Sequence, residues 1–477
     1  MSSFPSSLLD PFLNALRTPA SLDSTTNDHP SYYIHDPSTL VTSSEIKDFS
    51  ISTGASLFSH FESVLLSAQH SLTIVTCFWA RSESLKTLNH VLRTLSSRAL
   101  ASGNGTGKLR VRIRFSSLSV TQKLFHTRSL SGKPWPPATW VSKLGLPNPS
   151  ELTGLDLEVK SIFVLPFSVM HPKFVIVDGH TVLLPSCNCH IPAPHSPQPR
   201  STSSSSITIP SLFLPSPHHP NPDFTFPFLS AHPPPATPLN TFLLAAITHA
   251  TRSVVITTPN LTSPPAISAV LSALSSGVDI TIYTSARMMF LEQLLTAGTI
   301  TEWCVWLLRR KYRKLLQLDN TKTARTRCGI LTRWSKKRNN DSNINGRTLR
   351  DVEQQMPLQS QSQSHHHHQD EDDINEQRER KGIGRLNLFY FTPTTSPSSA
   401  QAAKLHLKFT IVDDEIVVLG SGNMDRASWY TSQELGVAFA SRDFAREVQA
   451  EFRRFLTVDE EDEHEEGFAG MQMRRVI

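Results

Sequence analysis

The sequence predicts an α/β fold made of two similar halves. The main observation is a repeated pattern of His-x-Lys, four residues, Asp and then Ser-x-Asn, which occurs at residues 171–188 and again at 406–423. A second observation is that segments with helical and strand periodicity alternate before each copy. The chain has 477 residues, of which 38% are hydrophobic, so it is long enough for two domains of ordinary size. Together these features indicate an internal duplication.

In the first half, the periodicity predicts two helices that alternate with two strands. The helices are expected at Ala55–Gln69 and Glu83–Ser97, and the strands at Leu72–Phe78 and Lys108–Phe115. The second strand, KLRVRIRF, alternates basic and apolar residues, which predicts one basic face.

The second half repeats this order. Helices are expected at Leu239–Ala250 and Pro264–Ser275, and strands at Ser253–Thr257 and Val278–Thr284. Alternation of this kind predicts sheets that are covered by helices. Both halves then reach a copy of the repeated pattern.

Each copy of the pattern is predicted to form a β-hairpin. Its histidine and lysine are two positions apart on a strand, so both side chains project from the same face. Asp178-Gly179 and Asp413-Asp414 are turn signals, each followed by a second apolar strand. Because the aspartate lies at the bend, we expect it to have a structural role rather than contact with a substrate.

Two such hairpins facing each other would gather two imidazoles, two ammonium groups and two amides around one site. This set suits the cleavage of a phosphodiester without a metal ion or another cofactor. One histidine can attack phosphorus while the other protonates the departing oxygen, and the lysines and amides can stabilise charge on the phosphoryl oxygens. The alternative is that both histidines are ordinary core residues, but the repeated lysine, serine and asparagine spacings argue against it.

The two motifs, HPKFVIVD with PSCN and HLKFTIVD with GSGN, resemble the signature of the phospholipase D superfamily, HxKx4D followed by GSxN in two copies. The resemblance implies a duplicated phospholipase D-like fold, in which two βα halves pack together with the active site at their interface. It further implies that the first-motif histidine is the nucleophile and the second-motif histidine is the acid. It assigns catalytic roles to His171, Lys173, Asp178, His406, Lys408, Asp413 and Glu434, and phosphate binding to Ser186, Asn188, Ser421 and Asn423.

The first copy departs from the family pattern. In the family, an acidic residue about eleven positions after the asparagine holds the other nitrogen of the histidine and fixes its tautomer. Glu434 has this place in the second copy, whereas no carboxylate follows Asn188 before Asp223. Three interpretations are open: a weakened enzyme, an acid supplied from elsewhere, or a missing segment. If His171 had lost its function, His406, with Glu434 behind it, would become the nucleophile.

The segment Glu302–Leu318, EWCVWLLRRKYRKLLQL, bears on the substrate. As a helix it would have an aromatic and apolar side and a basic side, which suits the surface of an anionic membrane. A core-facing helix with a solvated basic edge is an equally good interpretation. The same charge could follow a nucleic-acid backbone, but the formal net charge of the chain is only +5.

Three classes of function follow from these observations. The leading prediction is a phosphodiesterase or phosphatidyltransferase that acts on phospholipids, a group that includes phospholipase D and the cardiolipin-synthase-like enzymes. The alternatives are a nuclease of the same superfamily, acting on DNA or RNA, and a catalytically impaired membrane-binding protein. We expect a monomer because both motifs lie in one chain.

The composition also predicts how the chain is divided. Residues 1–50 are expected to form a poorly ordered lead, 51–230 the first half with a Pro/Ser/His-rich loop at 190–237, 238–456 the second half with a low-complexity insert at 318–383, and 457–477 an acidic tail.

Neither a metal site nor a membrane span is predicted. The five cysteines are scattered and odd in number, and Cys187-x-Cys189-His190 has no second pair with zinc spacing. No apolar run reaches the roughly eighteen residues of a transmembrane helix, and the first residues lack the features of a secretory signal. We therefore expect an intracellular protein, cytoplasmic or peripheral on a membrane, with a mitochondrial location as an alternative.

Overall fold

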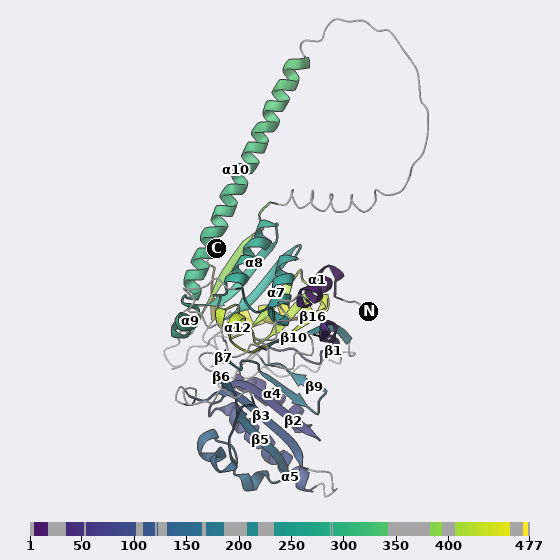
Figure 1. Ribbon diagram of the computed structural model, residues 1–477, viewed down its shortest axis with the longest axis vertical. Coiled ribbons are helices and arrows are strands. Elements are labelled where there is room, and N and C mark those ends of the chain that lie inside the picture. The colour runs from purple at the N-terminus through teal and green to yellow at the C-terminus, as the bar shows by residue number, and fades with distance from the viewer. Residues whose placement is uncertain are drawn as a thin grey trace, which may run out of the picture.

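The computed structural model has two large β-sheets, one around each copy of the repeated motif (Figure 1). It describes residues 4–17, 35–51, 54–101, 108–119, 122, 131–164, 168–185, 208–217, 233–286, 288, 290–341, 382–393, 406–457 and 471–475. The predicted α/β class is confirmed.

The sheet of the first half contains six strands within the described residues, in the order β4-β5-β3-β2-β8-β9. They are β2 (Ser71–Phe78), β3 (Leu109–Ser117), β4 (Lys133–Pro134), β5 (Leu155–Ser161), β8 (Phe174–Val177) and β9 (Thr181–Leu183). Helices α4 (Gly54–Leu66) and α5 (Glu83–Ala101) pack together against this sheet, with short helical turns at Pro137–Thr139, Trp140–Leu144 and Pro149–Leu152. The predicted basic face is present, since Arg112 and Arg114 on β3 pair with Asp156 and Glu158 on β5.

The sheet of the second half is larger. In the described part of the chain it has nine strands, in the order β1-β10-β16-β15-β14-β11-β12-β13-β17. They are β1 (Val41–Glu45), β10 (Thr208–Ser216), β11 (Ser253–Thr258), β12 (Asp279–Ser285), β13 (Leu386–Pro393), β14 (Phe409–Val412), β15 (Ile416–Gly420), β16 (Glu434–Ala440) and β17 (Met471–Arg475).

The strand order confirms the duplication. The series β5-β3-β2-β8-β9 and β13-β12-β11-β14-β15 match strand for strand. In each series the first three strands are parallel, and the last two form an antiparallel hairpin that carries the repeated motif. A helix precedes the central strand and a second helix follows it: α4 and α5 in the first half, α7 (Pro238–Thr248) and α8 (Pro264–Ser275) in the second.

Helices cover both faces of the second sheet. One face packs against α7, α8, the helix α1 (Ser6–Leu16) and the first turns of α10 (Thr301–Asp341), with Phe12 and Phe242 in edge-to-face contact. The other face packs against α13 (Arg442–Thr457) through Phe444, Val448 and Phe452. The short helices α9 (Phe290–Ala297) and α12 (Arg426–Tyr430) contact each other, and β6 (Phe163–Val164) pairs with β7 (Ser168–Val169) in a small ribbon.

Two segments predicted to be irregular belong to the second half. The interpretation of residues 1–50 as a poorly ordered lead is wrong for α1, because its Leu8, Phe12 and Leu16 recur at helical spacing and are buried. It is also wrong for β1, which pairs antiparallel with β10. The loop expected at 190–237 contains β10 itself, which pairs with β16 rather than with the first sheet.

The boundaries of the insert and the tail also need correction. The insert expected at 318–383 begins inside α10, which runs helical to Asp341 and projects from the body of the protein (Figure 1). The tail expected at 457–477 includes β17, which pairs antiparallel with β13. The histidine run at 365–368 and the acidic run at 459–466 lie outside the described residues. None of the described helices has the length and hydropathy of a membrane span.

Candidate active site

The first-motif histidine lies where the two halves meet. His171 is in the short segment between β7 and β8, and its backbone N–H donates a hydrogen bond of 3.0 Å to the carbonyl of Gln433 in the second half. The N–H of Gln433 donates in turn to Val169, at 2.8 Å, and Ser116 accepts the N–H of Met170, at 3.1 Å. Hydrogen bonds therefore hold the backbone of residues 169–171 in place, independently of the contacts of the histidine side chain.

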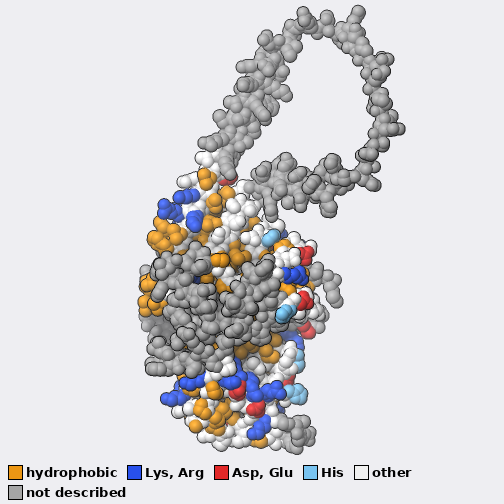
Figure 2. Space-filling view, viewed as in Figure 1, with side chains coloured by type: hydrophobic (Ala, Val, Ile, Leu, Met, Phe, Trp, Pro, Cys, Tyr) orange, Lys and Arg blue, Asp and Glu red, His pale blue; other side chains and the backbone are white. Residues whose placement is uncertain are grey.

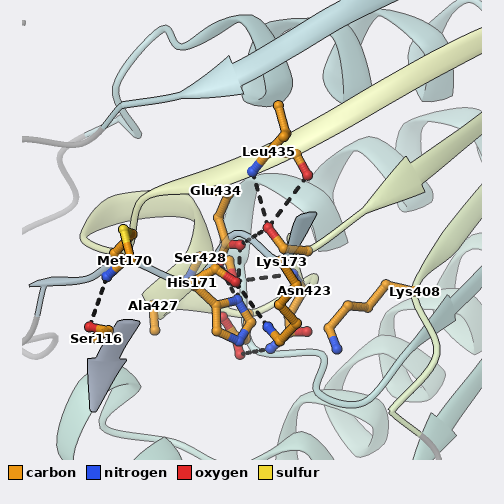
Figure 3. A network of polar contacts seen from close by, with 12 residues as sticks. Ser116, Met170, His171, Lys173, Lys408, Asn423, Ala427, Ser428, Glu434 and Leu435 are labelled. Carbon is orange, nitrogen blue, oxygen red and sulfur yellow. Dashed lines mark hydrogen bonds and ion pairs between the residues drawn. The ribbon is translucent and has the colours of Figure 1, made fainter. Parts of the chain in front are cut away.

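Glu434, the first residue of β16, binds the imidazole of His171. Both of its carboxylate oxygens lie 2.9 Å from Nδ1 of the ring (Figure 3). The carboxylate side chain is fully buried, whereas that of His171 is 15% exposed. The expectation that Glu434 stands behind His406 is therefore wrong, because the acid of the second copy reaches across to the histidine of the first. Of the three interpretations left open, an acid supplied from elsewhere is the one that this geometry bears out.

Two serine hydroxyls hold the carboxylate of Glu434 in place. Ser421 donates to one oxygen and Ser428 to the other, at 2.6 Å, while Ser421 Oγ also accepts the N–H of Leu435 at 3.0 Å. The assignment of Ser421 to phosphate binding is thus corrected, since its hydroxyl hydrogen is used by Glu434. Ser428 was not predicted from the sequence. The available signal was its position three residues after Asp425, the N-cap of α12.

The pKa values of both members of this buried pair are lowered. Burial lowers the pKa of His171 below its usual range, and the nearby Lys173 and Lys408 lower it further, which outweighs the opposing effect of Glu434. Burial would raise the pKa of Glu434, but the contact with His171 and the hydroxyl hydrogen bonds lower it overall. An ionised Glu434 beside a neutral His171 favours the tautomer with hydrogen on Nδ1, which leaves the lone pair on Nε2.

The motif lysines are buried and arranged alike in the two halves. Lys173 Nζ donates to the backbone carbonyl of His171 at 2.9 Å, and Lys408 Nζ donates to that of His406 at 2.7 Å. Lys408 Nζ also lies 2.9 Å from Nδ1 of His406. Because Lys408 and Asn423 lie beside His171 (Figure 3), groups from both motifs face one site, as predicted.

Asn423 is held by a chain of buried amides and carboxylates. Its Nδ2 donates to Asp425 at 2.9 Å, and the same carboxylate accepts a hydrogen bond from Asn260. Gln293 of α9 donates to Oδ1 of Asn260 at 3.1 Å. The other side-chain atom of Asn423, Oδ1, is buried and has no partner among the described residues. This amide is therefore fixed in orientation by contacts that extend to α9.

The motif aspartates lie at the other end of each hairpin. Asp178 accepts the backbone N–H groups of Gln69, His70 and Ser71 at 2.8–2.9 Å, which lowers its pKa although burial opposes this. Asp413 accepts the corresponding groups of residues 251–253. Both have positive φ, 51° and 53°, a conformation that Asp tolerates better than most residues. Their catalytic assignment is corrected, and the structural role predicted from their place at the bend is confirmed.

Part of the predicted site lies outside the described residues. Ser186 and Asn188 of the first motif, and Cys187, Cys189 and His190 beside them, are in this part of the chain, so their roles stay predictions. In the described ranges, no group of three His, Cys, Asp or Glu side chains is arranged to hold a metal ion.

The sequence of the second half decides the family. Residues 243–456 match the family model described as "Cardiolipin synthase, PLD-like domain". This range includes β11 to β16, the second motif and Glu434. The second half of the chain is a domain of the phospholipase D superfamily. This matched half carries the acid that binds the histidine of the other half.

Solved structures match this chain at low sequence identity and low TM-score. Phosphatidylserine synthase from Haemophilus influenzae Rd KW20 is 11% identical, with 91% of this chain and 88% of that chain covered and a TM-score of 0.42. NucT from Helicobacter pylori and Nuc from Salmonella typhimurium, a phospholipase D family member, are 14% and 15% identical. Each covers 46% of this chain and 86% of its own, with a TM-score of 0.23. No curated protein sequence matches this chain.

Proposed function

We propose that the protein is a phosphodiesterase or phosphatidyltransferase that acts on phospholipids through a phosphohistidine on His171. The observation that carries the proposal is the bond between Glu434 and Nδ1 of His171. It leaves Nε2 as the nucleophilic nitrogen and supplies a negative charge behind the ring, where positive charge develops during attack. The reaction needs no group beyond the side chains of the two motifs.

In the first step, Nε2 of His171 attacks phosphorus, and the bond between phosphorus and the leaving alcohol breaks. His406 gives a proton to the departing oxygen. The ammonium groups of Lys173 and Lys408 and the amide of Asn423 stabilise the negative charge on the other phosphoryl oxygens. The product is a phosphohistidine with Glu434 behind its ring.

In the second step, water or an alcohol attacks the phosphohistidine. The acceptor gives its proton to His406, the bond between phosphorus and nitrogen breaks, and His171 is restored. Water as the acceptor gives hydrolysis, and an alcohol gives transfer of the phosphatidyl group. Because both motifs are in one chain, we propose that a monomer suffices.

A nuclease of the same superfamily is the second candidate. The observation in its favour is the charge of α10, which has twelve Lys and Arg residues against three Asp and Glu. The case for an impaired protein is weaker, because it rested on a missing acid behind His171, and Glu434 occupies that position.

The test is turnover of a phosphorus-labelled phospholipid in vesicles, with single-stranded DNA as a parallel substrate. Quenching the reaction with base and mapping the labelled peptide should place the phosphohistidine at His171. His171→Ala and His406→Ala should both abolish turnover, whereas His180→Ala, which changes an exposed histidine at the tip of the first hairpin, should leave it intact. Turnover of DNA alone would move the protein to the nuclease class. Label on His406 would overturn the assignment of the nucleophile.

A further inference from the structure

An apolar surface lies on α9 and the first two turns of α10. We define it as the docking face; its residues are Phe290, Leu291, Leu294, Leu295, Trp303 and Trp306. Leu291 and Leu295 are 71% and 62% exposed, and Trp303 and Trp306 are 54% and 45% exposed. Six large apolar side chains exposed on two consecutive helices are the kind of apolar surface that marks an interaction site.

The docking face is not the core-facing side of these helices. α10 packs on the second half through Val305, Leu308 and Tyr312, which are buried. α9 turns Gln293 and Ala297 inward. The sequence left two interpretations for the start of α10, a core-facing helix or a membrane-binding one. The start of α10 has a buried side and a separate exposed side, and the exposed side carries both tryptophans.

Basic residues continue the docking face along α10. The rings of Trp303 and Trp306 are stacked, with centroids 4.8 Å apart, and the guanidinium of Arg310 lies 5.6 Å from the centroid of Trp306. Arg313 and Lys314 follow on the same side at helical spacing and are exposed. Figure 2 shows hydrophobic and basic side chains next to each other along this edge of the second half.

We propose that the docking face binds the surface of an anionic lipid bilayer. Leucine and phenylalanine side chains would enter the region between headgroups and acyl chains, and the tryptophans would lie at the headgroup level. The arginines and lysines above them would meet anionic headgroups. A nucleic acid would use the charge but not four exposed leucine and phenylalanine side chains. A second copy of the chain would bring arginines and lysines against one another.

The docking face is connected to the candidate active site. Gln293 lies on the inner side of α9, where its Oε1 accepts the N–H and hydroxyl of Thr301 at the start of α10, both at 2.8 Å. Its Nε2 donates to Asn260, which contacts Asp425, the partner of Asn423. The membrane would thus lie beside the loop that holds a phosphate-binding amide. The choice of lipid as the partner rests on the proposed function.

The proposal is tested by sedimentation of the full chain with vesicles, which needs no turnover. We expect binding to phosphatidylcholine vesicles that contain phosphatidylglycerol and at least about tenfold weaker binding by Leu291→Ser/Leu295→Ser/Trp303→Ser. The matched control is Leu100→Ser/Val182→Ser, which changes two exposed apolar residues of the first half, 60% and 52% exposed. This control should bind as the unchanged protein does.

A second variant tests the charge. Arg313→Glu/Lys314→Glu should lose binding to anionic vesicles, and the unchanged protein should lose it as salt is raised. Equal binding by the docking-face triple variant and the control would overturn the proposal. So would a dimer, measured by light scattering, that the triple variant converts to a monomer without change in vesicle binding.

Turnover of a short-chain, monomeric phospholipid separates this proposal from the proposed function. Turnover without vesicle binding would refute the proposal that the docking face binds membranes, and the proposed catalytic function would stand. Vesicle binding without turnover of any phospholipid would refute the proposed function, and the membrane-binding proposal would stand.

Discussion

Replacing Glu434 with glutamine tests whether a carboxylate from one half serves the histidine of the other. Glutamine has the same shape, but it removes the negative charge 2.9 Å from Nδ1 of His171. It can also present its NH2 group to the ring, which favours the tautomer with hydrogen on Nε2. Both effects act against the step in which Nε2 attacks phosphorus.

The size of the effect follows from the geometry. Opposite charges about 4 Å apart at an effective dielectric constant near 20 attract by roughly 4 kcal/mol, which corresponds to a rate factor of about 10³. In a Ser-His-Asp triad, the comparable change of carboxylate to amide lowers kcat by about 10⁴, because the tautomer is also wrong. We therefore expect Glu434→Gln to lower the rate of phosphohistidine formation by a factor of about 10³–10⁴.

The assay is single-turnover formation of the labelled phosphohistidine, followed across pH. Glu434 raises the pKa of His171 against the stronger effect of burial. Its removal should therefore move the acidic limb of the kcat/KM profile to lower pH, in addition to slowing the reaction. Glu415→Gln, which removes a carboxylate from a partly exposed pair with Arg442, is the control. A Glu434→Gln protein that retains a tenth or more of the rate would refute the assignment.

Further predictions concern the groups around this pair. Ser428→Ala leaves one oxygen of the buried Glu434 without its hydroxyl donor, so we expect a loss of about 1–3 kcal/mol in the free energy of unfolding, measured with urea. Asp178→Asn keeps the positive φ but cannot accept from three N–H groups, so it should lower stability by about 1–3 kcal/mol while kcat below the melting temperature stays unchanged. Because the pKa values of His171 and Glu434 are both lowered in the folded state, the unfolded chain binds more protons, and the free energy of unfolding should fall as pH drops below about 6.5. His406→Ala should lose far less activity on a diester with a p-nitrophenol leaving group, which needs no proton, whereas His171→Ala should lose all activity on both substrates.

The hairpins and the placement of their motif side chains could be predicted because the information is local. A period of two places His406 and Lys408 on one face of a strand, and Asp413 at the bend cannot reach that face. Two parallel strands of each half, β2 and β3 or β11 and β12, and the helices beside them were likewise predicted from periodicity, and the structure has them within a few residues of the expected bounds. The third parallel strand of each half, β5 or β13, was not predicted.

The partner of Glu434 could not be predicted, because spacing along the chain does not say which of two homologous sites a side chain enters. Ser428 gave no signal beyond that of a helix N-terminus. The strand β10 was missed because Pro210 and Pro215 argue against a strand, yet both are placed in its register. The helix α1 did carry a signal, since Leu8, Phe12 and Leu16 are four positions apart, but the surrounding serines and prolines favoured a loose segment.

Glu434 of the second half binds His171 of the first half, and this contact changes how the missing acid after Asn188 is interpreted. The duplicated strand order relates the two halves by an approximate symmetry. If the acid of the second copy serves His171, the same symmetry assigns the acid missing after Asn188 to His406 rather than to His171. A histidine that acts as a nucleophile must present one ring nitrogen in one tautomer. His171 meets this requirement, because Glu434, the two serines that bind Glu434 and the backbone hydrogen bonds to Gln433 are all in place. The acid missing from the first copy is therefore the one that would bind His406, whose ring nitrogen contacts Lys408 instead. In the proposed mechanism, the departure therefore bears on proton transfer to the leaving group, while the contacts that hold His171 for its attack on phosphorus are present.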